Sequence, residues 1–143
     1  DDLLGKWTAV DKDTKAVVEK FTCVWKKKGE SVKWEGTTFE NGKITGQSTS
    51  ITSYDPELGV FVEKYDQAKG QPEKIRQLHW NPNNNTLEAE FIKPKFRLGM
   101  DLKMTWKKIV ANLWNHNIEV FEKGKLVFYR EVIQTRKAPK TEK

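Results

Sequence analysis

Two histidines and one cysteine have the widest chemical repertoire in this chain of 143 residues. A zinc site needs three or four ligands, and neither paired cysteines nor a His-Glu-x-x-His spacing accompanies His79 and His116. One axial histidine suffices for haem, but both histidines stand beside asparagines, which favours imidazoles at a rim or on the surface. Covalent catalysis by Cys23 requires a histidine and a carboxylate beside the thiol. We expect no metal site and no cofactor, and we assign no catalytic residue.

Aromatic side chains are the second chemical feature, since six Trp, seven Phe and three Tyr make up 11% of the residues. Small β-barrels can enclose a cavity that is lined by aromatic rings and a few polar groups. The alternative is that the rings fill the barrel and cover its ends. The rings therefore predict either a small-molecule cavity or a solid interior.

Four polar residues lie on predicted strands, and the pattern leaves the direction of their side chains open: Arg76, Gln77, His79 and Arg130. An inward polar group costs several kcal/mol unless it is paired, so it would mark a polar or anionic ligand head. The candidate ligand-binding residues are Trp34, Tyr54, Tyr65, Arg76, His79, Trp106 and Arg130.

The net charge of +6 is spread too thinly to indicate nucleic-acid binding. The last seven residues hold three Lys and one Glu, a net +2, which leaves +4 for the other 136 residues. The densest basic run, Lys26 to Lys28, precedes Gly29, where a solvated turn is expected, and no zinc-finger spacing or basic helix accompanies it. We expect no nucleic-acid partner.

Signals for the membrane and for export are weak. No apolar run approaches the roughly 18 residues of a membrane span, so we expect none. The sequence starts at Asp1 without Met, which is compatible with export after removal of a signal peptide, and a cytoplasmic location is the alternative.

The elements that must position these residues follow a period of two. Apolar and mostly polar residues alternate from Phe21 to Trp25 and again from Leu98 to Trp106, as is typical of half-buried strands. Asn41-Gly42 and Lys123-Gly124 lie in near-identical hairpin contexts. We predict ten strands, near residues 4–10, 17–27, 31–39, 44–54, 60–66, 73–80, 86–92, 97–110, 112–122 and 126–136.

Ten short strands in one domain must hide their edges. A closed barrel removes the edges, whereas a sandwich only shortens them, and consecutive hairpins favour the barrel. We therefore predict an all-β fold, a single antiparallel up-and-down barrel of about 8–10 strands. The barrel would take residues 1–136, followed by a frayed basic tail at 137–143.

The segment Leu3-Leu4-Gly5-Lys6-Trp7-Thr8-Ala9-Val10 resembles the opening strand of lipocalins and fatty-acid-binding proteins, which begin with Gly-x-Trp. The remaining chain is more similar to an uncharacterised bacterial lipocalin-like (calycin-like) family, through Tyr54-Asp55-Pro56 and Gly124-Lys125. The resemblance implies that Trp7 closes one barrel end beneath a basic side chain of the last strand. Arg136 is the candidate for that side chain, and Arg130 is the alternative. The family implies no particular ligand.

Three functions follow as hypotheses. The first is a barrel that binds a small hydrophobic or amphipathic molecule without catalysis. The second is an enzyme that uses a histidine and an acidic group at the barrel mouth, and the third is an interaction module that presents an exposed aromatic patch. The oligomeric state is left open.

Overall fold

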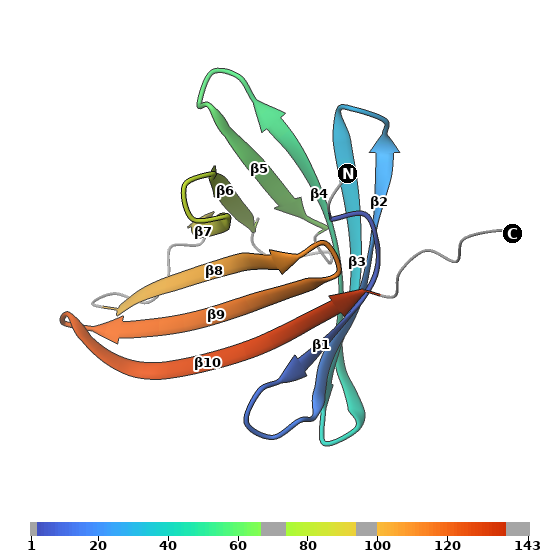
Figure 1. The fold of residues 1–143 in the computed structure, drawn as a ribbon. Helices are drawn as coiled ribbons and strands as arrows, with labels where there is room; N and C mark the ends of the chain where they lie inside the picture. The colour runs from blue at the N-terminus through green and yellow to red at the C-terminus, as the bar shows by residue number, and fades with distance from the viewer. Residues whose placement is uncertain (1–2, 67–73, 94–99, 137–143) are drawn as a thin grey trace, which may run out of the picture.

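The computed structural model describes residues 3–66, 74–93 and 100–136, which form ten antiparallel strands (Figure 1). No helix occurs in these ranges. The strands are β1 (Gly5–Asp11), β2 (Val17–Lys27), β3 (Ser31–Glu40), β4 (Lys43–Asp55), β5 (Val60–Tyr65), β6 (Ile75–Asn81), β7 (Thr86–Lys93), β8 (Met100–Val110), β9 (Leu113–Glu122) and β10 (Lys125–Arg136).

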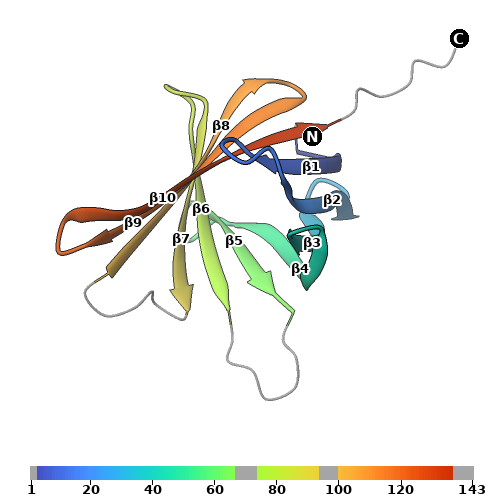
Figure 2. The same cartoon turned by 90° about the horizontal axis from the view of Figure 1, so that it is seen from below.

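The strands close into an up-and-down barrel. Each strand pairs with the next one in the chain, and β1 pairs with β10 from Trp7↔Arg136 to Asp11↔Val132 (Figures 1 and 2). That last pairing removes the free edges which a sandwich would keep. The predicted barrel is confirmed. The expected tail at 137–143 and the predicted strand positions 73 and 97–99 lie outside the described residues.

Two hairpin turns show how local sequence sets the strand order. Asn41 and Gly42 have φ of 50° and 77°, and Lys123 and Gly124 have φ of 48° and 78°. Positive φ at both central residues gives the turn twist that matches the twist of paired strands. Lys-Gly therefore adopts the same turn as the stronger signal Asn-Gly.

The register determines which side chains enter the barrel, because directly paired residues lie on the same face of a sheet. One inward row runs from Gln134 on β10 through Ala9 and Glu19 to Thr38. Alternate residues along each strand point outward. On the β6–β8 side, the inward residues Leu78, Ala89 and Met104 form a compact apolar core.

Trp7 and Arg136 meet at one end of the barrel. Trp7 is 2% exposed, and the guanidinium carbon of Arg136 lies 4.8 Å from the centre of its ring system, a cation–π contact. The guanidinium also donates hydrogen bonds to Asn112 Oδ1 and the Ala111 carbonyl, each at 2.9 Å, and to the Leu4 carbonyl. Arg136 thus ties the first strand to the β8–β9 turn.

Gly5 explains the glycine of the Gly-x-Trp element. Its φ is +123°, and a Cβ at this position would lie 2.8 Å from Cδ of Arg136. Any larger residue would be strained in its backbone and would push the arginine away from Trp7.

We expect Gly5→Ala to lower the free energy of unfolding by about 2 kcal/mol, since it combines backbone strain with this clash. Urea denaturation measures the effect. Gly29→Ala is the matched control, because Gly29 also has positive φ, +77°, but no described atom lies within 4 Å of its Cβ position. An equal loss in the free energy of unfolding for the two variants would show that the packing of Arg136 against Gly5 does not contribute.

Candidate functional site

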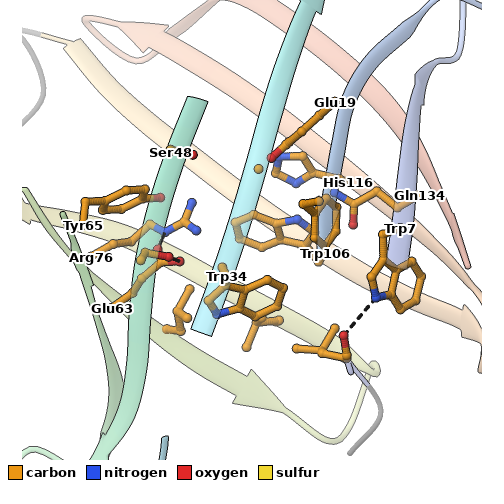
Figure 3. Close-up of a pocket in the computed structure, with 16 residues that line it drawn as sticks. Trp7, Glu19, Trp34, Ser48, Glu63, Tyr65, Arg76, Trp106, His116 and Gln134 are labelled. Carbon is orange, nitrogen blue, oxygen red and sulfur yellow. Dashed lines mark hydrogen bonds and ion pairs between the residues drawn. The ribbon is translucent and has the colours of Figure 1, made fainter. Parts of the chain in front are cut away.

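A cavity of about 180 Å³ lies at the centre of the barrel, and we call it the inner cavity (Figure 3). Its wall combines aromatic rings with polar side chains from almost every strand. The lining residues are Leu3, Trp7, Glu19, Phe21, Trp34, Gly36, Ser48, Ser50, Glu63, Tyr65, Arg76, Leu78, Leu87, Trp106, His116 and Gln134.

One wall of the inner cavity holds a buried ion pair. Arg76 Nε donates to Glu63 Oε1 at 2.7 Å, and Ser50 Oγ donates to Glu63 Oε2 at 2.9 Å. Glu63 is only 3% exposed. The guanidinium carbon of Arg76 lies 5.0 Å from the Trp106 ring centre and 5.8 Å from that of Tyr65. The rings of Tyr65 and Trp106 therefore cover the Arg76 guanidinium, and the carboxylate of Glu63 neutralises its charge.

His116 holds a fixed place on the wall formed by β9. Its ring stacks on Trp106 with centroids 4.1 Å apart and an interplanar angle of 7°. Nδ1 lies 2.9 Å from the Thr105 carbonyl, which can only accept, so Nδ1 carries the proton and Nε2 keeps a lone pair. Burial lowers the pKa of His116 to about 4, with smaller contributions from other groups. The imidazole is therefore neutral at pH 7.

Glu19 on β2 is the second carboxylate in the wall of the inner cavity. Within the described ranges, the structure shows no hydrogen bond or ion pair to it. Burial raises the pKa of Glu19, while Arg76 lowers it and Glu63 raises it. Among the described residues, the inner cavity thus holds one carboxylate that is paired with an arginine and one without a direct partner.

A second cavity of about 380 Å³, the outer cavity, lies toward the end of the barrel where β2 turns into β3. Trp34 lies between the two cavities, and its Nε1 donates to Thr52 Oγ1 at 3.0 Å. Leu3, Leu78 and Leu87 also line both spaces. The outer lining is mainly apolar: Leu3, Leu4, Cys23, Trp25, Gly29, Glu30, Val32, Trp34, Thr52, Ser53, Tyr54, Phe61, Leu78, Trp80, Leu87 and Trp114.

The structure brings together most of the residues that the sequence singled out. Trp34, Tyr65, Arg76 and Trp106 all line the inner cavity. Tyr54 lines the outer cavity instead, where its ring meets that of Phe61 with centroids 5.4 Å apart.

Two predicted lining residues lie elsewhere. His79 is exposed on the outer face of β6, three residues from the inward Arg76, so its expected place in the cavity is wrong. Arg130 shares the inward face but lies toward the other end of the barrel, where its Nε donates to Asp11 Oδ2 at 3.0 Å. It does not line the inner cavity.

One further expectation needs correction. His116 is 9% exposed, so the expected rim or surface imidazole is wrong for this histidine.

Cys23, to which the sequence analysis assigns no catalytic role, is fully buried, and burial raises the pKa of its thiol to about 12. Such a thiol is not a nucleophile at neutral pH.

Sequence reasoning missed Glu19, Glu63, His116 and Gln134 as cavity residues. Each lies two positions from an aromatic or apolar residue on the inward face, as Glu63 does from Tyr65. Every second residue from an inward apolar residue also points inward, so counting in twos along each strand would have found these polar residues.

One exposed apolar segment on β10 bears on the interaction hypothesis. Leu126, Val127, Phe128 and Tyr129 are consecutive on β10, and each is about half exposed. No described contact identifies a partner for this segment, so the interaction module stays a prediction.

Together these features define a class of protein, a closed up-and-down β-barrel with an internal cavity that is polar at its centre. A comparison with models of known protein families finds no match for this chain, and neither does a comparison with curated proteins. The lipocalin-like resemblance therefore stays a prediction based on its short motifs.

Neither a metal-binding cluster nor a membrane-spanning helix occurs in the described ranges. Nowhere in residues 3–66, 74–93 and 100–136 do three His, Cys, Asp or Glu side chains gather closely enough to hold a metal ion. The same ranges contain no helix with the length and apolarity needed to cross a bilayer.

Proposed function

We propose that this protein binds a small amphipathic molecule inside its barrel and carries out no chemistry on it. The observation that carries the proposal is the pair of adjoining cavities, the outer one mainly apolar and the inner one polar at its centre. An apolar body in the outer cavity would supply affinity at about 0.8 kcal/mol per buried CH₂. Polar groups of the inner cavity would orient the head and supply specificity.

Intrinsic fluorescence suits the test, because all six tryptophans line one cavity or the other. We expect a saturable change in emission when the protein is titrated with eight-carbon amphiphiles. Val32→Phe fills the outer cavity and should weaken binding about tenfold or more.

Val24→Phe is the matched control, because the same substitution then falls on the exposed outer face of the same sheet. It should leave binding unchanged. A flat response to every amphiphile in the wild-type protein would refute the proposed function.

The enzyme alternative has one observation in its favour, the presence of His116 and Glu19 in the same cavity wall. A general base works best when its pKa lies near the operating pH. Burial lowers the pKa of His116 to about 4, which makes its imidazole a weak base at neutral pH. Binding without catalysis is therefore the function that the geometry supports best.

A further inference from the structure

The inner cavity has two chemically different walls. On the β5–β6 side, Glu63 and Arg76 satisfy each other. On the opposite side, Glu19, His116 and Gln134 present polar atoms to the cavity (Figure 3). Gln134 is 6% exposed, and no hydrogen bond to its amide group is formed by any part of the chain that the structure describes. Its amide lines the cavity and is not one of the fully enclosed polar atoms without a partner, so it is open to a ligand group.

The strand register explains why these groups converge. Ala9 is paired with Gln134 on one side and with Glu19 on the other, so the register brings these two side chains to the same face of the sheet. Gly36 on the next strand makes room for the Glu19 carboxylate, since a Cβ there would lie 2.9 Å from Glu19 Oε1. Glu19, Gln134 and His116 all line the inner cavity.

The free atoms on this wall are mainly acceptors. His116 Nε2 has a lone pair, because Nδ1 donates to the Thr105 carbonyl. Glu19 offers carboxylate oxygens, and Gln134 offers an amide oxygen beside its NH₂ group. A ligand group that donates several hydrogen bonds would satisfy all three residues.

Charge distinguishes among such donors. Arg76 is already paired with Glu63 at 2.7 Å, so an incoming carboxylate would meet an occupied cation and the additional carboxylate of Glu19. A cationic nitrogen would instead form charge-assisted hydrogen bonds with the half-buried Glu19 carboxylate, which has no hydrogen bond or ion pair among the described residues. The rings of Phe21 and Trp34, also in the wall, present faces that attract cations.

We infer that the ligand is an amphipathic amine, whose ammonium group binds Glu19, Gln134 and His116 Nε2 while its apolar body extends along Trp34 into the outer cavity. This inference rests on the proposed function and adds the chemical class of the ligand head. It also narrows the expectation of a polar or anionic head to a polar, cationic one, because the inward Arg76 is already paired with Glu63.

Three probes of equal chain length test the head group: octylamine, octanol and octanoate, titrated at pH 7 by calorimetry and tryptophan fluorescence. We expect octylamine to bind about 10- to 100-fold more tightly than either of the others. Glu19→Gln should remove most of that preference for octylamine over octanol.

Glu35→Gln is the matched control, because Glu35 lies exposed on the outer face of β3. It should not alter any affinity. Gln134→Met provides a second variant that keeps the side chain's length and removes its acceptor, in case Glu19→Gln does not fold. We expect it to weaken octylamine binding several-fold.

The outcomes separate the two proposals. Binding of octanol or octanoate without a preference for octylamine would overturn the amine inference and leave the proposed function standing. An octylamine preference that survives in both cavity variants would also overturn the assignment to this wall. Failure of all three probes would refute the proposed function and the amine inference together.

Discussion

Replacing Glu63 by leucine is expected to lower the free energy of unfolding by about 3–5 kcal/mol, because it leaves the buried guanidinium of Arg76 without its counter-charge. Glu63 is 3% exposed, and both of its carboxylate oxygens accept hydrogen bonds, from Arg76 at 2.7 Å and from Ser50 at 2.9 Å. The rings of Phe91 and Trp106 cover the guanidinium, so water cannot readily replace the lost carboxylate. Urea denaturation at pH 7 measures the change.

Two controls distinguish the loss of pairing from the loss of a side chain. The double variant Glu63→Leu/Arg76→Met removes both charges and should recover most of the lost stability, since apolar residues of similar volume often replace a buried ion pair at little cost. Glu90→Leu changes an exposed glutamate on β7 and should alter stability by no more than about 0.5 kcal/mol. A single variant and a double variant of equal stability would argue against a structural role for the pair.

The second large effect is a loss of stability in acid that depends on His116. Burial lowers the pKa of this residue from its ordinary value of 6.5 to about 4. Between these pH values the unfolded chain binds a proton that the folded protein does not. The stabilisation is therefore fully present above pH 6.5 and is lost as the pH falls towards 4. Its size is about 3 kcal/mol.

His116→Asn removes this titration and can keep a donor near the Thr105 carbonyl. Denaturation midpoints measured from pH 7 to pH 4 should fall less steeply for this variant than for the wild type, even though the variant begins less stable. His79→Asn is the matched control, because His79 is exposed on the outer face, and its profile should follow that of the wild type. Identical slopes for wild type and His116→Asn would show that His116 is protonated in the folded state.

The fold was predictable because strand formation and local turns depend on near neighbours. Alternation of apolar and polar residues indicated all ten strands. Asn41-Gly42 and Lys123-Gly124 marked tight hairpins, which force consecutive strands to pair. Because each strand pairs with the next one in the chain, the outermost strands could hide their edges only by pairing β1 with β10.

The site was predictable in part. Alternation alone shows that Arg76 and His79, three positions apart on one strand, cannot face the same way, but it does not say which of them points inward. Leu78 resolves this for β6, since it is buried in the core and therefore places Arg76 on the inward face. The same reasoning extended along β2 and β5 would have placed Glu19 beside Phe21 and Glu63 beside Tyr65.

What the sequence by itself determined is the set of strands, their turns and the two faces of each strand, because these depend on residues a few positions apart. Only the tertiary structure decided which polar groups meet. Glu63 and Arg76 come from different strands, and Gln134 and Glu19 lie far apart in the chain on either side of Ala9. These arrangements depend on the register of neighbouring strands and on the β1–β10 pairing that closes the barrel. A shift of one residue in either register would send the same side chains to the outer face, because successive residues of a strand point in opposite directions.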